Sequence, residues 1–122
     1  MSDDAPPTPL VGQTFRVVEI GGRPTLEAPS AELTFGGDGR VTGRATINRV
    51  FGPYEIVGDQ ITFGMLGSTM MAGLPDAMDQ EHRLLQTLAG PLTIDAGAAD
   101  GRVTLLSDGA RALVLEYAVL ED

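Results

Sequence analysis

Short segments in which apolar residues alternate with polar ones recur along most of the chain, and glycine-containing turns separate many of them. A period of two is typical of a β-strand that buries one face. The turns carry pairs such as Gly58-Asp59 and Asp108-Gly109, which suit tight hairpins. The expected strands cover residues 13–20, 32–35, 41–47, 54–57, 60–63, 92–95, 102–107 and 112–120. The pattern therefore predicts about seven or eight short antiparallel strands.

One segment, between Pro75 and Gly90, has the period of a helix instead. Asp76 is well placed as an N-cap, and Asp79 precedes Arg83 by one turn. Apolar residues at positions 77, 84, 85 and 88 form one stripe, and Gly90-Pro91 ends the pattern. The predicted fold class is α+β, mainly β: an antiparallel sheet or partly open barrel with one helix packed against it.

The length of 122 residues, with 43% hydrophobic and 20% charged residues, is typical of one globular domain. Residues 1–9 are rich in proline and aspartate and are expected to form a flexible tail. Residues 10–122 are expected to form the domain. No stretch approaches the length of about 20 apolar residues that a membrane-spanning helix requires.

The charged residues narrow the range of functions. The net charge is −9, which repels phosphate backbones, so nucleic acid is not an expected partner. The basic residues are all arginine, which excludes a P-loop lysine and a Schiff base. Without cysteine there is no thiol nucleophile, thiolate metal site or disulfide. We expect no cofactor, no metal site and no catalytic residue, and a monomeric chain.

Several motifs follow one another between residues 32 and 90: ELTFGGDGRVTG, INRVFGPY, QITFGMLGSTMMAG and QEHRLLQTLAG. Their order resembles that of the META/HslJ family of bacterial envelope proteins, and the resemblance covers almost everything after Leu10. The positions that match the family motif, with a structural or binding role, are Asn48, Arg49, Gly52, Tyr54, Thr69, Met71 and Glu81. Ile47 and Gly73 stand where the family commonly carries cysteine.

The resemblance implies a non-catalytic binding or structural domain of the cell envelope or periplasm, connected with stress responses. Its partner would be a protein, a lipid or a small hydrophobic ligand. Residues 1–9 would then be a spacer after a lipidated cysteine that precedes this chain. If Met1 is the natural start, a cytoplasmic stress or assembly factor is the alternative. If the two cysteine positions lie close together, their joint replacement removes a crosslink worth about 2–4 kcal/mol.

Asn48, Arg49 and Tyr54 fall between two expected strands. Asn48 is expected to satisfy backbone groups at a bend, with ligand recognition as the alternative. Glu81 lies on the apolar side of the helix and is expected to pair with an arginine such as Arg49 beneath the sheet. An enzyme of another class, a small carboxylate-dependent hydrolase or isomerase, would need a pocket that joins Glu81 to Arg49 or Tyr54.

The methionines and the single histidine allow two interpretations. Met65, Met70, Met71 and Met78 are expected to fill gaps under the sheet; a Cu(I) site that includes His82 is the alternative. Glu81 and His82 are neighbours on the predicted helix and point about 100° apart, so they are not expected to form an acid–base pair.

Overall fold

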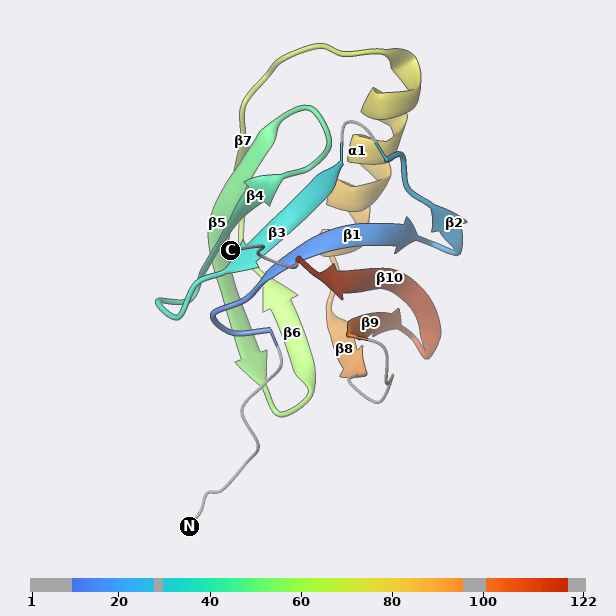
Figure 1. Ribbon diagram of the computed structural model, residues 1–122. Coiled ribbons are helices and arrows are strands. Elements are labelled where there is room, and N and C mark those ends of the chain that lie inside the picture. Colours follow the sequence, from blue (N-terminus) through green and yellow to red (C-terminus); the bar gives the residue numbers. More distant parts are fainter. Residues whose placement is uncertain (1–9, 28–29, 96–100, 119–122) are drawn as a thin grey trace.

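The computed structural model describes residues 10–27, 30–95 and 101–118, and its strands close into an antiparallel barrel (Figure 1). The barrel strands are β1 (Thr14–Ile20), β3 (Ala31–Phe35), β4 (Arg40–Arg44), β5 (Arg49–Val57), β6 (Gln60–Phe63), β8 (Leu92–Asp95), β9 (Arg102–Ser107) and β10 (Ala110–Tyr117). Each pairs with the next along the chain, and β10 returns to pair with β1. Two-residue strands extend this barrel: β2 (Arg23–Pro24) on β1, and β7 (Gly67–Ser68) on β5.

The barrel is closed, whereas the sequence left an open sheet and a partly open barrel as alternatives. The closing seam runs from the pair Phe15–Tyr117 to the pair Ile20–Leu113, with an irregularity between Val17 and Glu19. A closed barrel satisfies the backbone groups that an open sheet leaves exposed at its edges. The narrowest junction is β6–β8, which is limited to residues 60–61 and 92–93. The mainly β architecture and the strand number of about eight are confirmed.

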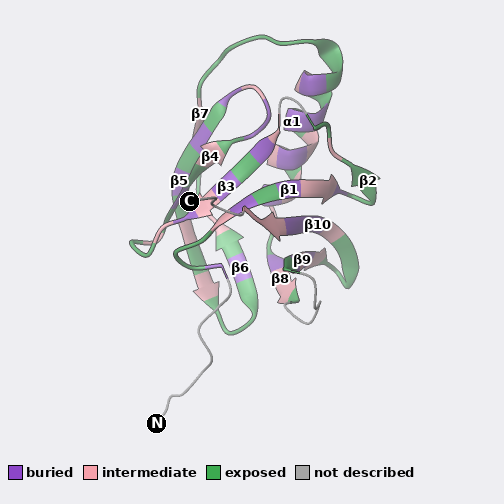
Figure 2. Ribbon diagram, in the orientation of Figure 1, coloured by how far each residue is buried: buried purple, intermediate pink, exposed green. Residues whose placement is uncertain are grey.

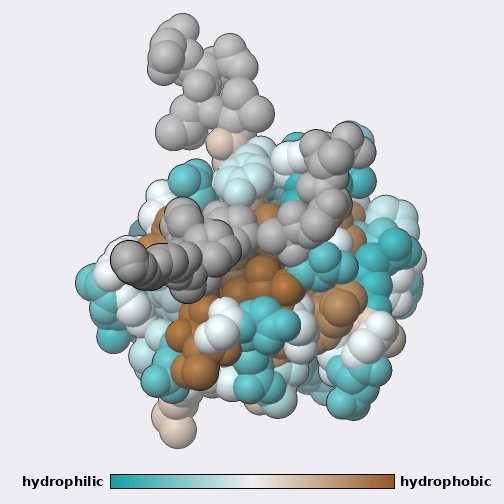
Figure 3. Space-filling model, turned by 90° about the horizontal axis from the view of Figure 1, so that it is seen from below, coloured by the Kyte–Doolittle hydropathy of each residue, from teal (hydrophilic) through white to brown (hydrophobic). Residues whose placement is uncertain are grey.

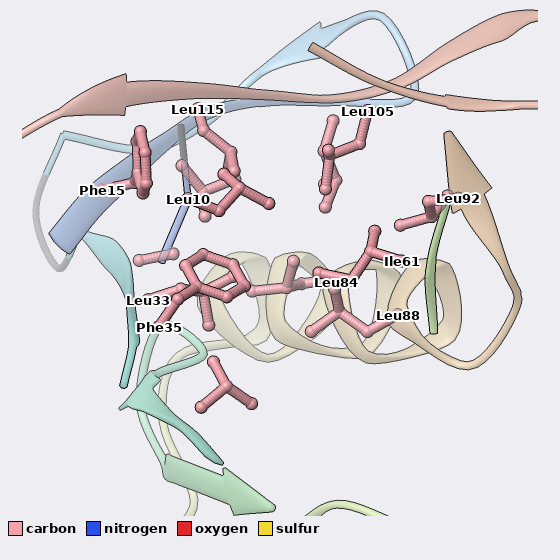
Figure 4. Close-up of a cluster of buried hydrophobic side chains, with 14 of the residues drawn as sticks. Leu10, Phe15, Leu33, Phe35, Ile61, Leu84, Leu88, Leu92, Leu105 and Leu115 are labelled. Carbon is pink, nitrogen blue, oxygen red and sulfur yellow. The ribbon is translucent and has the colours of Figure 1, made fainter. Parts of the chain in front are cut away.

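The inside of the barrel is filled by apolar side chains. Phe15, Leu33 and Phe35 are fully buried at one end of the cluster, and the rings of Phe15 and Phe35 meet edge-on at 6.0 Å (Figure 4). Helix α1 (Pro75–Leu88) adds Leu84 and Leu88 to the same core. Figure 2 shows buried positions along the strands and on one side of this helix. The interior is therefore a packed core.

The helix begins two residues earlier than the N-cap prediction required. Leu74 is the N-cap residue with an extended backbone, and no side chain caps the helix. Pro75 occupies the first turn, where its fixed φ suits a helix start and its missing N–H costs nothing. Asp76 therefore lies inside the first turn, and its prediction as N-cap was wrong. The Asp79–Arg83 pair is confirmed at 3.1 Å.

The predicted strand over residues 41–47 ends at Arg44, and residues 45–48 form a turn. Thr46 has a φ of 127°, which interrupts the alternation that we expected to continue to Ile47. The next strand, β5, then begins at Arg49, so Arg49 and Tyr54 lie within a strand and not between strands.

The last expected strand begins at Ala110; its final residues, 119 and 120, lie outside the described residues, as do residues 1–9. Within the described residues, no helix is long and apolar enough to cross a membrane.

Candidate functional site

Glu81 points from α1 to the turn at residues 45–48 and is only 5% exposed. Its Oε1 accepts hydrogen bonds from the backbone N–H groups of Ile47, at 2.8 Å, and Asn48, at 2.7 Å. Its Oε2 accepts a hydrogen bond from the side-chain Nδ2 of Asn48 at 2.6 Å. Both carboxylate oxygens are thus occupied by neutral donors, which compensate the burial of the polar group.

Asn48 connects this carboxylate to the segment that leads into the helix. Its Oδ1 accepts hydrogen bonds from the hydroxyl of Thr69 at 2.9 Å and from the backbone N–H of Met71 at 2.6 Å. Its Nδ2 also donates to the carbonyl of Met71 at 3.0 Å. The Thr69 hydroxyl in turn accepts from the N–H of Arg49. We call the side chains of Asn48, Thr69 and Glu81, with these backbone groups, the Asn48–Glu81 network.

A second pair of buried polar residues lies beside this network, and the sequence interpretation missed it. Gln80 is almost fully buried; its Nε2 donates to the hydroxyl of Thr46 at 3.0 Å. Its Oε1 accepts from the backbone N–H of Leu26 at 2.7 Å. The available signal was helical spacing: positions 80 and 81 fall between Ala77 and Leu84 on the buried stripe. Polar residues on such a stripe indicate buried hydrogen-bond partners.

The structure brings some of the expected site residues together and separates others. The pairing of Glu81 with Arg49 is wrong, because the Arg49 side chain is exposed and the donors to Glu81 come from the turn. Gly52 serves close packing, since a Cβ there would lie 2.9 Å from the Met65 carbonyl. Tyr54 is apart from the Asn48–Glu81 network.

Tyr54 contacts the turn between β3 and β4. Its hydroxyl donates to the carbonyl of Gly36 at 2.6 Å, and its ring meets Phe35 edge-on at 5.4 Å. Burial, together with the nearby negative charge of Asp38, raises the pKa of the Tyr54 hydroxyl above its ordinary value. This phenol is therefore a neutral hydrogen-bond donor that holds the turn.

Ile47 and Gly73, the positions that the resemblance associates with cysteine, are in contact. A Cβ on Gly73 would lie 2.7 Å from Cγ1 and 2.8 Å from Cδ1 of Ile47. The larger residue therefore fills the space that the smaller one leaves open. In this chain, packing joins the turn to the segment before α1 at this contact.

The expectation that the methionines fill the core is wrong for most of them. Met65 is 93% exposed and Met70 is 92% exposed; Met71 is also exposed, and Met78 is half-buried. Met65, Met70 and Met71 lie on the segment of residues 64–74, which passes outside the barrel from β6 through β7 to α1 (Figure 1), whereas Met78 lies on α1. We call residues 64–74 the methionine strap. The period-two pattern of the strands does not extend to it; Leu66 packs against the core, whereas Met65, Met70 and Met71 are exposed.

Hydrophobic residues also gather on the face of the molecule seen from below, with hydrophilic residues beside them (Figure 3). Val57, at the end of β5 that leads into the β5–β6 turn, is one of the exposed large hydrophobic residues of the chain. Exposed apolar surface therefore exists outside the methionine strap as well.

Comparisons with known proteins identify the family and the fold. The META domain family model matches residues 8–118. A protein from Burkholderia xenovorans, solved by NMR, has a TM-score of 0.73 at 18% identity, covering 98% of this chain and 97% of that chain. A second NMR structure has a TM-score of 0.67 at 20% identity, covering 86% and 88%. No curated protein matches. At these identities the structural likeness shows the fold alone.

Proposed function

The chain belongs to the META domain family, and on that premise we propose that it is a non-catalytic binding domain of the bacterial cell envelope. In this proposal the barrel is a rigid scaffold, and the methionine strap is the surface that meets a protein, a lipid or a small hydrophobic molecule. A connection with stress responses belongs to the same proposal, because the family resemblance implies it.

The use of Glu81 as a structural acceptor is the observation that carries the non-catalytic part. A general base must lie within hydrogen-bond reach of a substrate proton. Both oxygens of Glu81 instead accept hydrogen bonds from the turn and from Asn48, and the side chain is buried. Arg49 and Tyr54, which an enzymatic pocket would have joined to Glu81, lie elsewhere. This arrangement supports a scaffold role for the carboxylate.

The methionine strap supports the binding part of the proposal. Its backbone is fixed, because β7 pairs with β5 and the Asn48–Glu81 network holds Thr69 and Met71. Several of its apolar side chains are nevertheless exposed, including Met65, Met70 and Leu74. Exposed apolar groups on a fixed frame are typical of interaction sites, and methionine adapts to irregular partner surfaces.

A capture experiment tests this binding surface. The chain carrying Met65→Ser, Met70→Ser and Leu74→Ser is compared with the unchanged chain in native affinity capture from envelope extracts. Val57→Ser, which removes an exposed apolar group elsewhere, is the matched control. The strap variant should have nearly the same melting temperature as the unchanged chain, since each exposed substitution shifts stability by about 0.5 kcal/mol or less. We expect it to lose the specific partner while the control retains it; equal recovery by all three chains contradicts the proposal.

The cellular location is tested separately, by fractionation of host cells that express the natural gene with a tag at the C-terminus of its product. Recovery in the envelope or periplasmic fraction agrees with the proposal. Recovery in the cytoplasm favours the alternative stress or assembly factor. Protein abundance before and after heat shock tests the connection with stress.

A further inference from the structure

The arginines divide into two groups according to their partners. Arg16, Arg83, Arg102 and Arg111 each lie beside a carboxylate oxygen. The others, Arg23, Arg40, Arg44 and Arg49, form no ion pair with any carboxylate of the described residues. Arg40, Arg44 and Arg49 in this second group lie on β4 and β5, with exposed side chains. Although the chain has a net charge of −9, its described residues therefore place three arginines without an ion pair on two neighbouring strands.

Arg44 and Arg49 are direct register partners across β4 and β5. Like charges opposite each other on one face of a sheet are destabilising. Among the described residues, the only carboxylate in register with them is that of Glu32, which lies opposite Arg44 on β3. Glu32 and Arg44 form no ion pair. Among the described residues, no carboxylate forms an ion pair with either arginine, so the charge of Glu32 offsets their mutual repulsion only in part.

A hollow of about 320 Å³ lies over these arginines, and its lining includes Glu32, Thr42, Arg44, Arg49 and Phe51. Thr42 and Phe51 form the next register pair on the same face as Arg44 and Arg49. The Phe51 ring is 43% exposed and lies over Gly67 of β7, where a Cβ would approach its Cε1 to 2.5 Å. The missing side chain of Gly67 therefore makes room for an aromatic wall. The volume is at the lower end of the range for small-molecule sites.

We propose that this hollow binds a small monoanion: a carboxylate attached to an apolar or aromatic group. Guanidinium groups recognise carboxylates through paired, charge-assisted hydrogen bonds. Arg44 and Arg49 together exceed the charge of Glu32 by one unit, which matches a single negative charge and disfavours a dianion. The Phe51 ring provides apolar contact beside the anion. This site goes beyond the proposed function and does not require the methionine strap, so either proposal can fail alone.

The site is tested by NMR titration of the ¹⁵N-labelled chain with phenylacetate, at about pH 7. The neutral phenylacetamide and inorganic phosphate serve as comparison probes. We expect saturable shifts of the Thr42, Gly43 and Phe51 amides and of the Arg44 and Arg49 Nε–H groups. The double variant Arg44→Gln/Arg49→Gln should bind phenylacetate at least about tenfold more weakly, since two charge-assisted contacts are lost.

The matched control is Arg16→Gln/Arg102→Gln, which removes the same charge from arginines that already contact Glu116. It should bind phenylacetate as the unchanged chain does. The proposal is overturned if phenylacetate produces no saturable shift in the unchanged chain, or if phenylacetamide binds equally well. Tighter binding of phosphate refutes the monoanion assignment. Equal weakening in the control variant shows that only the net charge of the chain matters.

Discussion

Two carboxylates of this protein occupy opposite environments. Glu81, in the Asn48–Glu81 network, is buried and accepts hydrogen bonds only from uncharged N–H groups. Glu116, on β10 near the closing seam, has a side chain that is 30% exposed and lies between Arg16, at 2.7 Å, and Arg102, at 3.4 Å. Without the Glu81 carboxylate, its buried N–H donors would have no acceptor, because water does not reach them. Without the Glu116 carboxylate, water can solvate Arg16 and Arg102 in its place. The uncharged network should therefore contribute more to the fold than the ion pairs.

The substitution Glu81→Gln should produce the largest loss of stability. The new amide NH₂ would face an N–H donor, either on the turn backbone or on Asn48, and at least one buried donor would remain unsatisfied. We expect the free energy of unfolding to fall by about 3 kcal/mol in urea denaturation. Glu116→Gln is the control and should lose less than about 1 kcal/mol. Equal losses in the two variants would show that burial does not distinguish these carboxylates.

A smaller effect is expected from Gly73→Ala, at the other contact between the turn and the methionine strap. The added Cβ would meet Cγ1 and Cδ1 of Ile47, so overpacking should cost about 1 kcal/mol or more in thermal unfolding. Ile47→Ala removes these atoms. Gly73→Ala should therefore cost less in the Ile47→Ala background than alone; identical costs in both backgrounds would rule out the contact as the cause.

The smallest effect is a pH dependence that arises at Glu116. The hydrogen bond from Arg16, with support from Arg102, lowers the pKa of the Glu116 carboxyl below its ordinary value. Because the folded pKa is lower than the unfolded pKa of about 4.3, its contribution is present above that pH and is lost as the pH falls through the folded pKa. The difference in unfolding free energy between the unchanged chain and Glu116→Gln should shrink from about pH 7 to about pH 3. A constant difference contradicts this origin.

The strands and the helix could be predicted because their signals are local. The alternation in β1 and β3 and the apolar stripe of α1 are periodic within each segment, and one side of each faces the core. The turn at residues 45–48 has no such signal. Its conformation depends on the hydrogen bond from the Asn48 N–H to Glu81, which is 33 positions away in the chain. For this reason the strand predicted from alternation alone continued to Ile47, whereas β4 ends at Arg44.

The membership of the candidate site was predicted in part, and its contacts were not. The motif comparison selected Asn48, Thr69, Met71 and Glu81, and these residues meet in one network. Composition, in contrast, suggested that an arginine would neutralise Glu81, because neutral backbone donors carry no sequence signal. The exposure of Met65 and Met70 was also missed, since burial of an apolar residue outside a periodic segment depends on where the segment passes.

Hydrogen exchange at the backbone amide of Asn48 tests the central claim most directly. This amide lies in a turn outside the regular strands, yet it donates to the buried Glu81 carboxylate at 2.7 Å. We predict that it exchanges as slowly as the amides of the β1–β10 seam, and that Glu81→Gln removes this protection while the seam amides remain slower. Rapid exchange of the Asn48 amide in the unchanged chain, as in an exposed turn, would contradict the claim that Glu81 holds the fold together.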